Sequence, residues 1–323
     1  MPRQTEAFRL WKEDGSAGVA AAFDRINAVA TTAAGTRSKI QILRSKSLER
    51  IPWLVHGFST RAGGLSSLYG GNTLNLGFTK DDQRKVVVQN RAKLLKEIDA
   101  RSKGKPWPLL TLCQIHSAAI HHARSVEVNP LTGDGLITAE PGMAIAVQTA
   151  DCLPVIVVDT KRRAVGVFHA GWRGTVQRIV EKGIGEMRKQ FGSFPEDLRA
   201  AIGPGVHSCC YQVGTEVRER FGSQFSYAEK LFREVKESDV VRDKYPLLFL
   251  TARAPGHSEL PTRLFLDLVE ANRRQLLDAG LSRKNIDSSP LCTSCRVDLL
   301  FSHRAEKGVT GRMMAIAGIR RKS

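Results

Sequence analysis

The sequence predicts an α+β fold in which helices pack on a mixed β-sheet core, with a hairpin-rich centre and a single large domain. The first observation behind this prediction is a close succession of apolar runs, MAIAVQ (143–148), LPVIVVD (153–159) and AVGVFH (164–169). The second is that strand–turn–helix transitions lie beside these runs along the chain. Hairpins mixed with such transitions favour a mixed sheet over a regular parallel α/β arrangement.

The N-terminal part of the chain is the least patterned. Residues 1–50 are predicted to form an N-terminal extension, partly mobile, because they are rich in Ala and lack a periodic apolar pattern. The first buried strand is expected at Trp53–Val55. Asp81–Asp82 are expected to start a helix that buries one apolar face. The folded domain is therefore predicted to span residues 51–323.

Further elements follow the central strands. The polar segment DTKRR is predicted to form a hairpin turn between residues 153–159 and 164–169. The remaining elements are predicted as a helix from about Thr175 to Gln190, a strand at 199–203, a helix from about Arg263 to Ala279 closed by Gly280, and a final strand at 312–319.

The charge of the chain indicates affinity for anions. The 323 residues include 49 Lys and Arg against 32 Asp and Glu, which gives a formal net charge of +17. The basic residues are scattered, and no recognition motif accompanies them, so specific nucleic-acid binding is not expected. No oligomeric state is indicated.

The cysteine count and the hydropathy of the sequence limit the classes of protein to which the chain can belong. Six cysteines in 323 residues do not make a disulfide scaffold. The N-terminus lacks the apolar core of a signal peptide, and no run of about 18 apolar residues suggests a membrane span. A soluble cytoplasmic protein with reduced thiols is expected.

The segment FHAGWRGT (168–175) combines chemically versatile side chains at one strand-to-helix turn. A helix N-terminus attracts anions, Thr175 is a plausible N-cap, and the Arg173 guanidinium suits phosphate or carboxylate. The alternative is a purely structural turn in which Gly supplies conformational freedom and Trp172 packs.

A second constellation joins this turn to two other segments. If residues 153–159 and 164–169 pair as a hairpin, Cys152 and His169 lie at the same end of the sheet. His116, in LCQIHSAAI, is a third candidate. One thiolate and two imidazoles would hold zinc with one open position, and Cys152 with His169 would also suit a nucleophile pair. The alternative is a buried thiol and two hydrogen-bonded histidines.

Two further segments carry weaker signals. FSHRAEKGVTGR (301–312) places Arg304 and Arg312 around a Gly-containing turn, which could bind an anion or be a solvated loop. Cys292 and Cys295 form a CxxC motif, but no second CxxC motif accompanies it, so a structural zinc site is not predicted there.

Together, these segments resemble the YfiH-like family, historically labelled multicopper polyphenol oxidase or laccase domain and later assigned as a purine nucleoside phosphorylase. The resemblance covers about residues 53–319, and residues 51–323 are accordingly identified as a YfiH-like catalytic domain. The segments that carry it occur in the order HGFSTRAGG, LNLG, QIHS, TADCLPV, FHAGWRGT, AIGPGVHSCCYQVG, CTSC, FSHR and TGRMMAIAG.

The resemblance implies a zinc-dependent enzyme that splits purine nucleosides with phosphate and also deaminates adenosine. The substrates it implies are adenosine, inosine, guanosine and methylthioadenosine. The implied zinc ligands are His116, Cys152 and His169, and these are also the implied catalytic residues together with Asp151. The implied substrate- and phosphate-binding residues are Arg61, Asn75, Arg173 and Arg304.

Two positions depart from the family pattern. Gln212 stands where the family usually has Glu in CCYEVG, so a carboxylate is missing there. His303 stands where an aromatic residue is usual.

Three other functions are weighed against this one. Copper would also suit thiolate and imidazole ligands, as the older polyphenol oxidase label suggests, but the eight histidines include no HxH pair of the kind multicopper oxidases use. A metal-free cysteine hydrolase would use Cys152 as nucleophile and His169 as base. A nucleic-acid-binding protein would use the net positive charge.

Overall fold

Two compact units make up the chain. The computed structural model describes residues 39–125, 131–236 and 262–321, so most of the predicted N-terminal extension lies outside the described residues. The large unit comprises residues 1–207 and 268–323, and the small unit comprises residues 208–267. The sequence did not separate these units.

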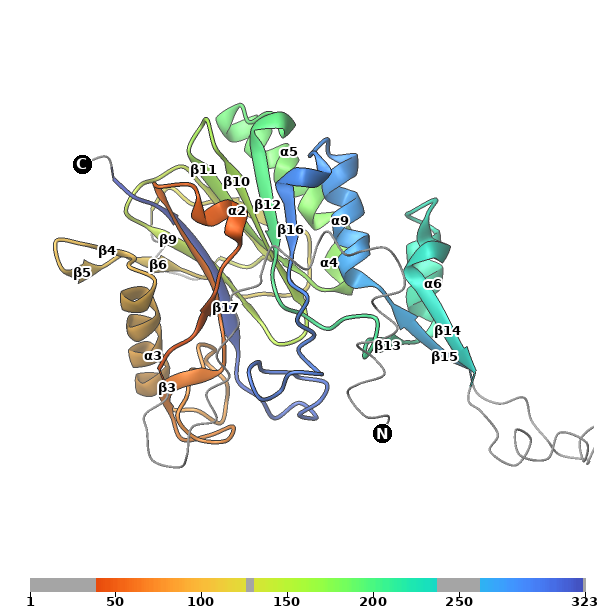
Figure 1. Ribbon diagram of the computed structural model, residues 1–323, viewed down its shortest axis with the longest axis horizontal. Helices are drawn as coiled ribbons and strands as arrows, with labels where there is room; N and C mark the ends of the chain where they lie inside the picture. Colours follow the sequence, from red (N-terminus) through yellow and green to blue (C-terminus); the bar gives the residue numbers. More distant parts are fainter. Residues whose placement is uncertain (1–38, 126–130, 237–261, 322–323) are drawn as a thin grey trace, which may run out of the picture. The chain divides into compact units, whose positions relative to one another are not determined.

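The large unit contains two mixed β-sheets (Figure 1). The strands of the first sheet are, in spatial order, β1 (Ile42–Leu43), β2 (Leu54–Ser59), β17 (Met313–Ile319), β9 (Ala144–Thr149) and β6 (Leu109–Leu110). The strands of the second are β16 (Ile286–Ser288), β12 (Leu198–Ile202), β10 (Leu153–Asp159), β11 (Ala164–Ala170), β8 (Gly135–Thr138) and β7 (Ile120–His122).

The core of the large unit lies between the two sheets. Apolar side chains from both sheets form one buried cluster, in which Phe58 and Ala315 of the first sheet pack with Ile156 and Val167 of the second. Strands β10 and β11 are buried along their whole length. Their continuous Val and Ile runs therefore reflect a sheet that is covered on both faces.

Helices cover the outer faces of both sheets (Figure 1). Helix α3 (Arg84–Glu97) packs Leu94 and Leu95 in a second apolar cluster with Val55 and Ile316 of the first sheet. Helices α5 (Ile179–Phe191) and α9 (Leu268–Asp278) contact β11 and β12 of the second sheet, respectively. The shorter elements of the large unit are α2 (Lys46–Glu49), β3 (Ala62–Ser66), β4 (Arg101–Ser102), β5 (Lys105–Pro106), α4 (Trp172–Val176) and the 3-10 turns Pro195–Asp197 and Arg283–Asn285.

Three glycines make room for the ring of Phe168 in β11. A Cβ atom added at Gly135, Gly166 or Gly183 would lie between 2.3 and 2.9 Å from a carbon of that ring. Gly183 belongs to α5, so its missing side chain allows the helix to approach the strand closely. This packing fixes the backbone of β11 immediately before His169.

The described residues of the small unit form a three-stranded sheet, α6 (Thr215–Gly222) and the 3-10 turn Ala228–Leu231. Its strands are β13 (Gln212–Val213), β15 (Thr262–Leu266) and β14 (Phe232–Lys236), in that order. The ring of Phe221 packs edge-on against Phe232 and next to Phe225. Gln212, which replaces the usual Glu, is exposed in β13.

The predicted α+β class and its central hairpin are confirmed. Strands β10 and β11 pair antiparallel, with Leu153 opposite Ala170 and Asp159 opposite Ala164. The strands predicted at 143–148, 199–203 and 312–319 correspond to β9, β12 and β17. No helix among the described residues is long and apolar enough to span a membrane.

Two helix predictions were wrong in part. The helix predicted from Thr175 begins earlier, at Trp172, and is interrupted because Arg178 has a left-handed backbone conformation (φ 61°). Gly171, not Thr175, is the N-cap of α4, and the Thr175 hydroxyl is buried against the Asn272 amide. Residues 263–266 of the helix predicted at 263–279 belong instead to strand β15 (Thr262–Leu266), because a short run of Leu and Phe next to Thr also suits a strand.

Candidate metal centre

The β10–β11 hairpin brings Cys152 and His169 together. Pro154 lies opposite His169 in the hairpin, so Cys152, just before β10, is at the same end as the histidine. His116 reaches this end from the connection between β6 and β7, with a left-handed backbone (φ 60°). One possible ligand atom from each of the three side chains lies within 4.8 Å of the others. The structure therefore assembles the group that the sequence predicted.

The three side chains differ in their access to solvent. His169 is buried, Cys152 is half-buried and His116 is exposed. The rings of His116 and His169 meet edge to face, with centroids 5.0 Å apart. The group is thus anchored in the sheet on one side and open to solvent on the side of His116.

A buried carboxylate, Asp134, holds the ring of His169 and the backbone of His116. It lies immediately before β8, has no exposed surface, and accepts a hydrogen bond of 2.8 Å on Oδ1 from Nδ1 of His169. The same oxygen accepts from the His116 backbone N–H at 3.1 Å. The Ser117 backbone N–H and hydroxyl donate to Oδ2 at 2.6 and 2.8 Å. With Nδ1 engaged, Nε2 of His169 is the nitrogen left to bind a metal, as in carboxylate–histidine–metal arrangements.

The electrostatics of the group favour charged forms. Burial alone would raise the pKa of Asp134, but hydrogen bonds from His169 and Ser117 outweigh it and lower that pKa to about 2. Burial also opposes the thiolate of Cys152, yet the positive charge of His169 and hydrogen bonds from both histidines lower the pKa of Cys152. A thiolate is the form that binds a metal or acts as a nucleophile.

Gly171 gives the Cys152 sulfur its space. A Cβ atom at position 171 would lie 2.7 Å from Sγ of Cys152 and 3.4 Å from Cδ2 of His116. The backbone φ of Gly171 is −71°, which any residue can adopt. Its role is therefore close approach to the ligand group and not conformational freedom.

Asp151 lies next to the group but faces two C-terminal loops. Its carboxylate accepts hydrogen bonds from the hydroxyls of Thr293 and Ser302 and from the backbone N–H of Arg304. The residue is 9% exposed and has a φ of 92°, which is rare for a residue other than Gly.

The four predicted substrate-binding residues differ from one another in exposure: two are exposed and two are buried or largely buried. Arg173 is exposed and lies over the ring of Trp172. Arg304 is exposed as well. Arg61 is largely buried, because its guanidinium pairs with Glu306 at 3.1 Å and lies over the Phe301 ring, at the edge of an open surface hollow.

Asn75 is fully buried. Its amide oxygen accepts from the backbone N–H groups of Gly77 and Arg312, and its nitrogen donates to Asp82 and to the Gly77 carbonyl. Asn75 therefore ties the LNLG segment to the start of β17.

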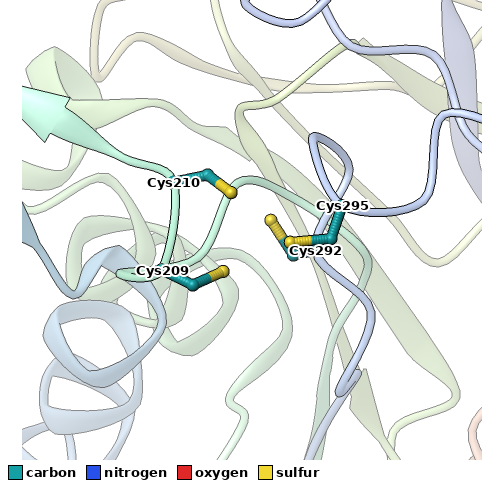
Figure 2. Close-up of side chains that lie close together, drawn as sticks. All are labelled: Cys209, Cys210, Cys292 and Cys295. Carbon is teal, nitrogen blue, oxygen red and sulfur yellow. The ribbon is translucent and has the colours of Figure 1, made fainter. Parts of the chain in front are cut away.

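Four more cysteines lie in two pairs, one in each unit (Figure 2). In the large unit, the sulfurs of Cys292 and Cys295 lie within 4.8 Å of each other on the turn after β16. The backbone N–H of His207 donates to the Cys292 sulfur at 3.5 Å. In the small unit, Cys209 and Cys210 are consecutive, and their sulfurs also lie within 4.8 Å of each other.

A two-sheet α+β fold with one cysteine and two histidines at the end of a central hairpin defines a protein with a candidate mononuclear metal centre. The family model described as multi-copper polyphenol oxidoreductase laccase matches residues 55–320. The chain belongs to this family, and the predicted resemblance to YfiH-like proteins is confirmed.

Curated relatives and solved structures agree with this family. The chain is 33% identical over 287 residues to purine nucleoside phosphorylase YlmD of Geobacillus stearothermophilus, which covers 83% of this chain and 94% of the relative. Over 189 residues it is 34% identical to adenosine deaminase RL5 of an unknown prokaryotic organism, covering 58% of this chain and 62% of the relative. The crystal structure of YlmD from Geobacillus stearothermophilus superposes with a TM-score of 0.71 at 31% identity, covering 88% of this chain and all of that one.

Proposed function

We propose that the protein is a zinc-dependent purine nucleoside phosphorylase that also deaminates adenosine. The observation that carries the proposal is the Cys152, His116 and His169 group, with His169 oriented by buried Asp134. Relatives at about one-third identity carry the names purine nucleoside phosphorylase and adenosine deaminase, which supports a nucleoside-processing enzyme. The proposed substrates are adenosine, inosine, guanosine and methylthioadenosine.

The donor set fits a zinc ion. One thiolate and two imidazoles leave the fourth tetrahedral position open, which is the arrangement of catalytic zinc sites. A bound zinc ion supplies Lewis-acid polarisation of a substrate oxygen or of water. By engaging Nδ1 of His169, Asp134 would leave the Nε2 atom available to hold the ion, and the burial of His169 keeps bulk water from that side of the group.

Phosphate and substrate would enter from the open side of the group, where His116 is exposed. The exposed guanidiniums of Arg173 and Arg304 are proposed to bind phosphate, because a guanidinium donates to phosphate in a fork geometry. Arg61 and Asn75 were predicted to bind substrate too. Their internal hydrogen bonds and ion pair support a role in shaping the surrounding loops.

The test is a panel of purine nucleosides assayed with and without inorganic phosphate. Phosphorolysis yields free base and ribose-1-phosphate only with phosphate, whereas deamination converts adenosine to inosine in its absence. Removal of zinc with a chelator, or Cys152→Ala, should abolish both activities, and added zinc should restore only the chelated wild type. Full activity in metal-free protein would refute the zinc assignment.

A metal-free cysteine hydrolase is the second candidate, because one specific observation favours it. Asp134, His169 and Cys152 are arranged in the order carboxylate, imidazole and thiol that nucleophilic cysteine enzymes use. A second histidine at the same sulfur favours a metal instead. Stoichiometric zinc in the purified protein would exclude the hydrolase, since a metal-bound sulfur is not a free nucleophile.

Copper is the alternative metal. Thiolate and imidazole ligands accept copper as readily as zinc. Among the described residues, however, only one group of potential ligands contains histidine, whereas a multicopper oxidase needs several. Metal analysis of protein expressed with both ions present separates the two assignments.

A further inference from the structure

We propose that Asp151 is a positioning residue. It fixes the backbone just before strand β10, where Cys152 lies, by hydrogen bonds to two C-terminal loops. The family resemblance implied that Asp151 is a catalytic residue, and a carboxylate in such a role can transfer a proton. The proposal rests on the zinc-dependent function given above and assigns a different role to one residue of the site.

The carboxylate of Asp151 already has three donors. Oδ1 accepts from the Thr293 hydroxyl at 2.6 Å and from the Ser302 hydroxyl at 2.7 Å, and Oδ2 accepts from the Arg304 backbone N–H at 2.7 Å. Thr293 and Ser302 have no exposed surface. A buried carboxylate that accepts three hydrogen bonds is held in one orientation by the groups around it.

The backbone of Asp151 is held as well. Its carbonyl accepts from the Val206 N–H at 2.8 Å, and its φ of 92° turns the chain sharply just before Cys152. A conformation this rare persists where surrounding contacts enforce it. The four hydrogen bonds to Asp151 are these contacts, and they set the direction in which the Cys152 side chain leaves the backbone.

Both loops lie far from Asp151 in the sequence, since Thr293 follows it by 142 residues and Ser302 by 151. Thr293 lies between Cys292 and Cys295 on the turn after β16, and its backbone N–H donates to the Gly205 carbonyl at 2.9 Å. Ser302 lies in the connection to β17, and its hydroxyl also accepts from the Ala305 N–H. Asp151 is the point at which both loops meet the strand end of the candidate metal centre, which gives the CxxC turn a role in that centre.

The chemistry of the donors separates positioning from proton transfer. Two of the three donors are hydroxyls, which can rotate and accept a hydrogen bond instead. An Asn at position 151 can therefore keep all three contacts, with its oxygen toward the Arg304 N–H and its NH₂ toward Thr293 and Ser302. Asn cannot carry a proton between substrate and solvent as a carboxylate does.

The experiment compares Asp151→Asn, Asp151→Ala and Thr293→Val, with Thr293→Ser as the matched control that keeps the hydroxyl. Zinc affinity is measured by competition with a chelator, and kcat and KM are measured for phosphorolysis of inosine. We expect Asp151→Asn and Thr293→Ser to stay within about threefold of wild type in zinc affinity and kcat, because their hydrogen bonds are retained. We expect Asp151→Ala to lose about 10- to 100-fold in zinc affinity, as when other groups that orient ligands are removed, and Thr293→Val to fall between.

Two outcomes would overturn the proposal. One is equal loss of kcat in Asp151→Asn and Asp151→Ala while both bind zinc like wild type, which would assign proton transfer to the carboxylate. The other is unchanged zinc affinity and kcat in both Thr293→Val and Asp151→Ala. If wild-type protein binds zinc but does not phosphorolyse nucleosides, the proposed function fails, and the zinc affinities of the variants still test the positioning role. If Asp151→Ala does not fold, the two Thr293 variants and Asp151→Asn carry the comparison.

Discussion

Asp134 and Asp151 are two buried carboxylates next to one cysteine–histidine group, and they accept hydrogen bonds from different kinds of donor. Each oxygen of Asp134 accepts from at least one backbone N–H, from His116 on Oδ1 and from Ile115 and Ser117 on Oδ2. Within the described part of the chain, one oxygen of Asp151 accepts from a backbone N–H and the other accepts from two hydroxyls. A backbone N–H cannot become an acceptor, whereas a hydroxyl can. An Asn at position 134 would therefore lose hydrogen bonds, whereas an Asn at position 151 can keep them.

The largest contrast should come from the same substitution at both positions. Asp134→Asn turns an NH₂ group toward a backbone N–H whichever way the amide lies, and it weakens the His169 contact. We expect a loss of about 3–5 kcal/mol in the free energy of unfolding, typical of a broken buried charged contact. Zinc affinity should fall by about 10- to 100-fold.

Urea unfolding and chelator competition, run side by side for Asp134→Asn and Asp151→Asn, measure this contrast. Equal losses of stability and zinc affinity in the two variants would show that it makes no difference whether the donors are backbone N–H groups or hydroxyls.

A glycine substitution tests the space around the ligand group. The Cβ atom of Gly171→Ala would lie 2.7 Å from the Cys152 sulfur, so the sulfur must move away from the two histidines. We expect zinc affinity to fall at least about tenfold, with about 1–3 kcal/mol lost in stability from overpacking. Isothermal titration with zinc and thermal unfolding measure the two effects.

Gly185→Ala is the matched control for that substitution. A Cβ atom at position 185, within α5, has no neighbour within 4 Å. Since Ala favours a helix over Gly by about 1 kcal/mol, this variant should be as stable as wild type or more stable, with unchanged zinc affinity. Loss of zinc in Gly185→Ala would point to a general effect of altering glycines near β11.

Lowering the pH should affect stability through two groups in different pH ranges, His56 in the first sheet and Asp134 beside the candidate metal centre. Burial, with a contribution from the Arg44 charge, lowers the pKa of His56 in β2 from 6.5 to about 3. The unfolded chain takes up this proton below pH 6.5 and the folded chain does not, so stability present above pH 6.5 should fall by up to about 1.4 kcal/mol per pH unit as the pH drops toward 3.

The Asp134 carboxyl affects the free energy of unfolding over a lower pH range than His56 does. Its folded-state pKa of about 2 lies below the ordinary 3.8, so its contribution is present above pH 3.8 and is lost as the pH falls toward 2. Unfolding measured between pH 7 and 4 should therefore depend on His56, and His56→Gln should flatten this part of the curve. A curve that His56→Gln leaves unchanged would assign the acid sensitivity to another group.

The smallest effect is expected at Ser117. Its hydroxyl is one of several donors to Asp134, and the Ser117 backbone N–H remains in Ser117→Ala. We expect a loss of about 1 kcal/mol in the free energy of unfolding and little change in zinc affinity. A loss as large as that of Asp134→Asn would show that the hydroxyl, and not the backbone, holds this carboxylate.

The proximity of Cys152 and His169 could be predicted from the sequence because it depends on a local hairpin. The polar turn between two apolar runs set the register, and the register placed Cys152 near His169. Asp134 was missed because a lone Asp between Gly133 and Gly135 is typical of an ordinary turn. Its role depends on the pairing of β8 with β11, which local patterns do not reveal.

The same limit explains the errors elsewhere. The segment at 262–266 fits both a helix and a strand, and its pairing with β13 and β14 decides in favour of the strand. The break at Arg178 lies within a sequence that otherwise suits a continuous helix. The substrate-binding role that the resemblance implies for Arg61 and Asn75 stays a prediction, and no sequence pattern shows that Arg61 pairs with Glu306 and that Asn75 donates to Asp82.

The β10–β11 hairpin also has a consequence for the order of assembly during folding. Its turn is short and its strands are neighbours in sequence, so closing it costs little chain entropy and can occur early. Cys152 and His169 then meet before the distant loops that hold Asp151 have docked. A nascent chain would thus present a thiol–imidazole pair to metal ions while the rest of the two sheets is still forming.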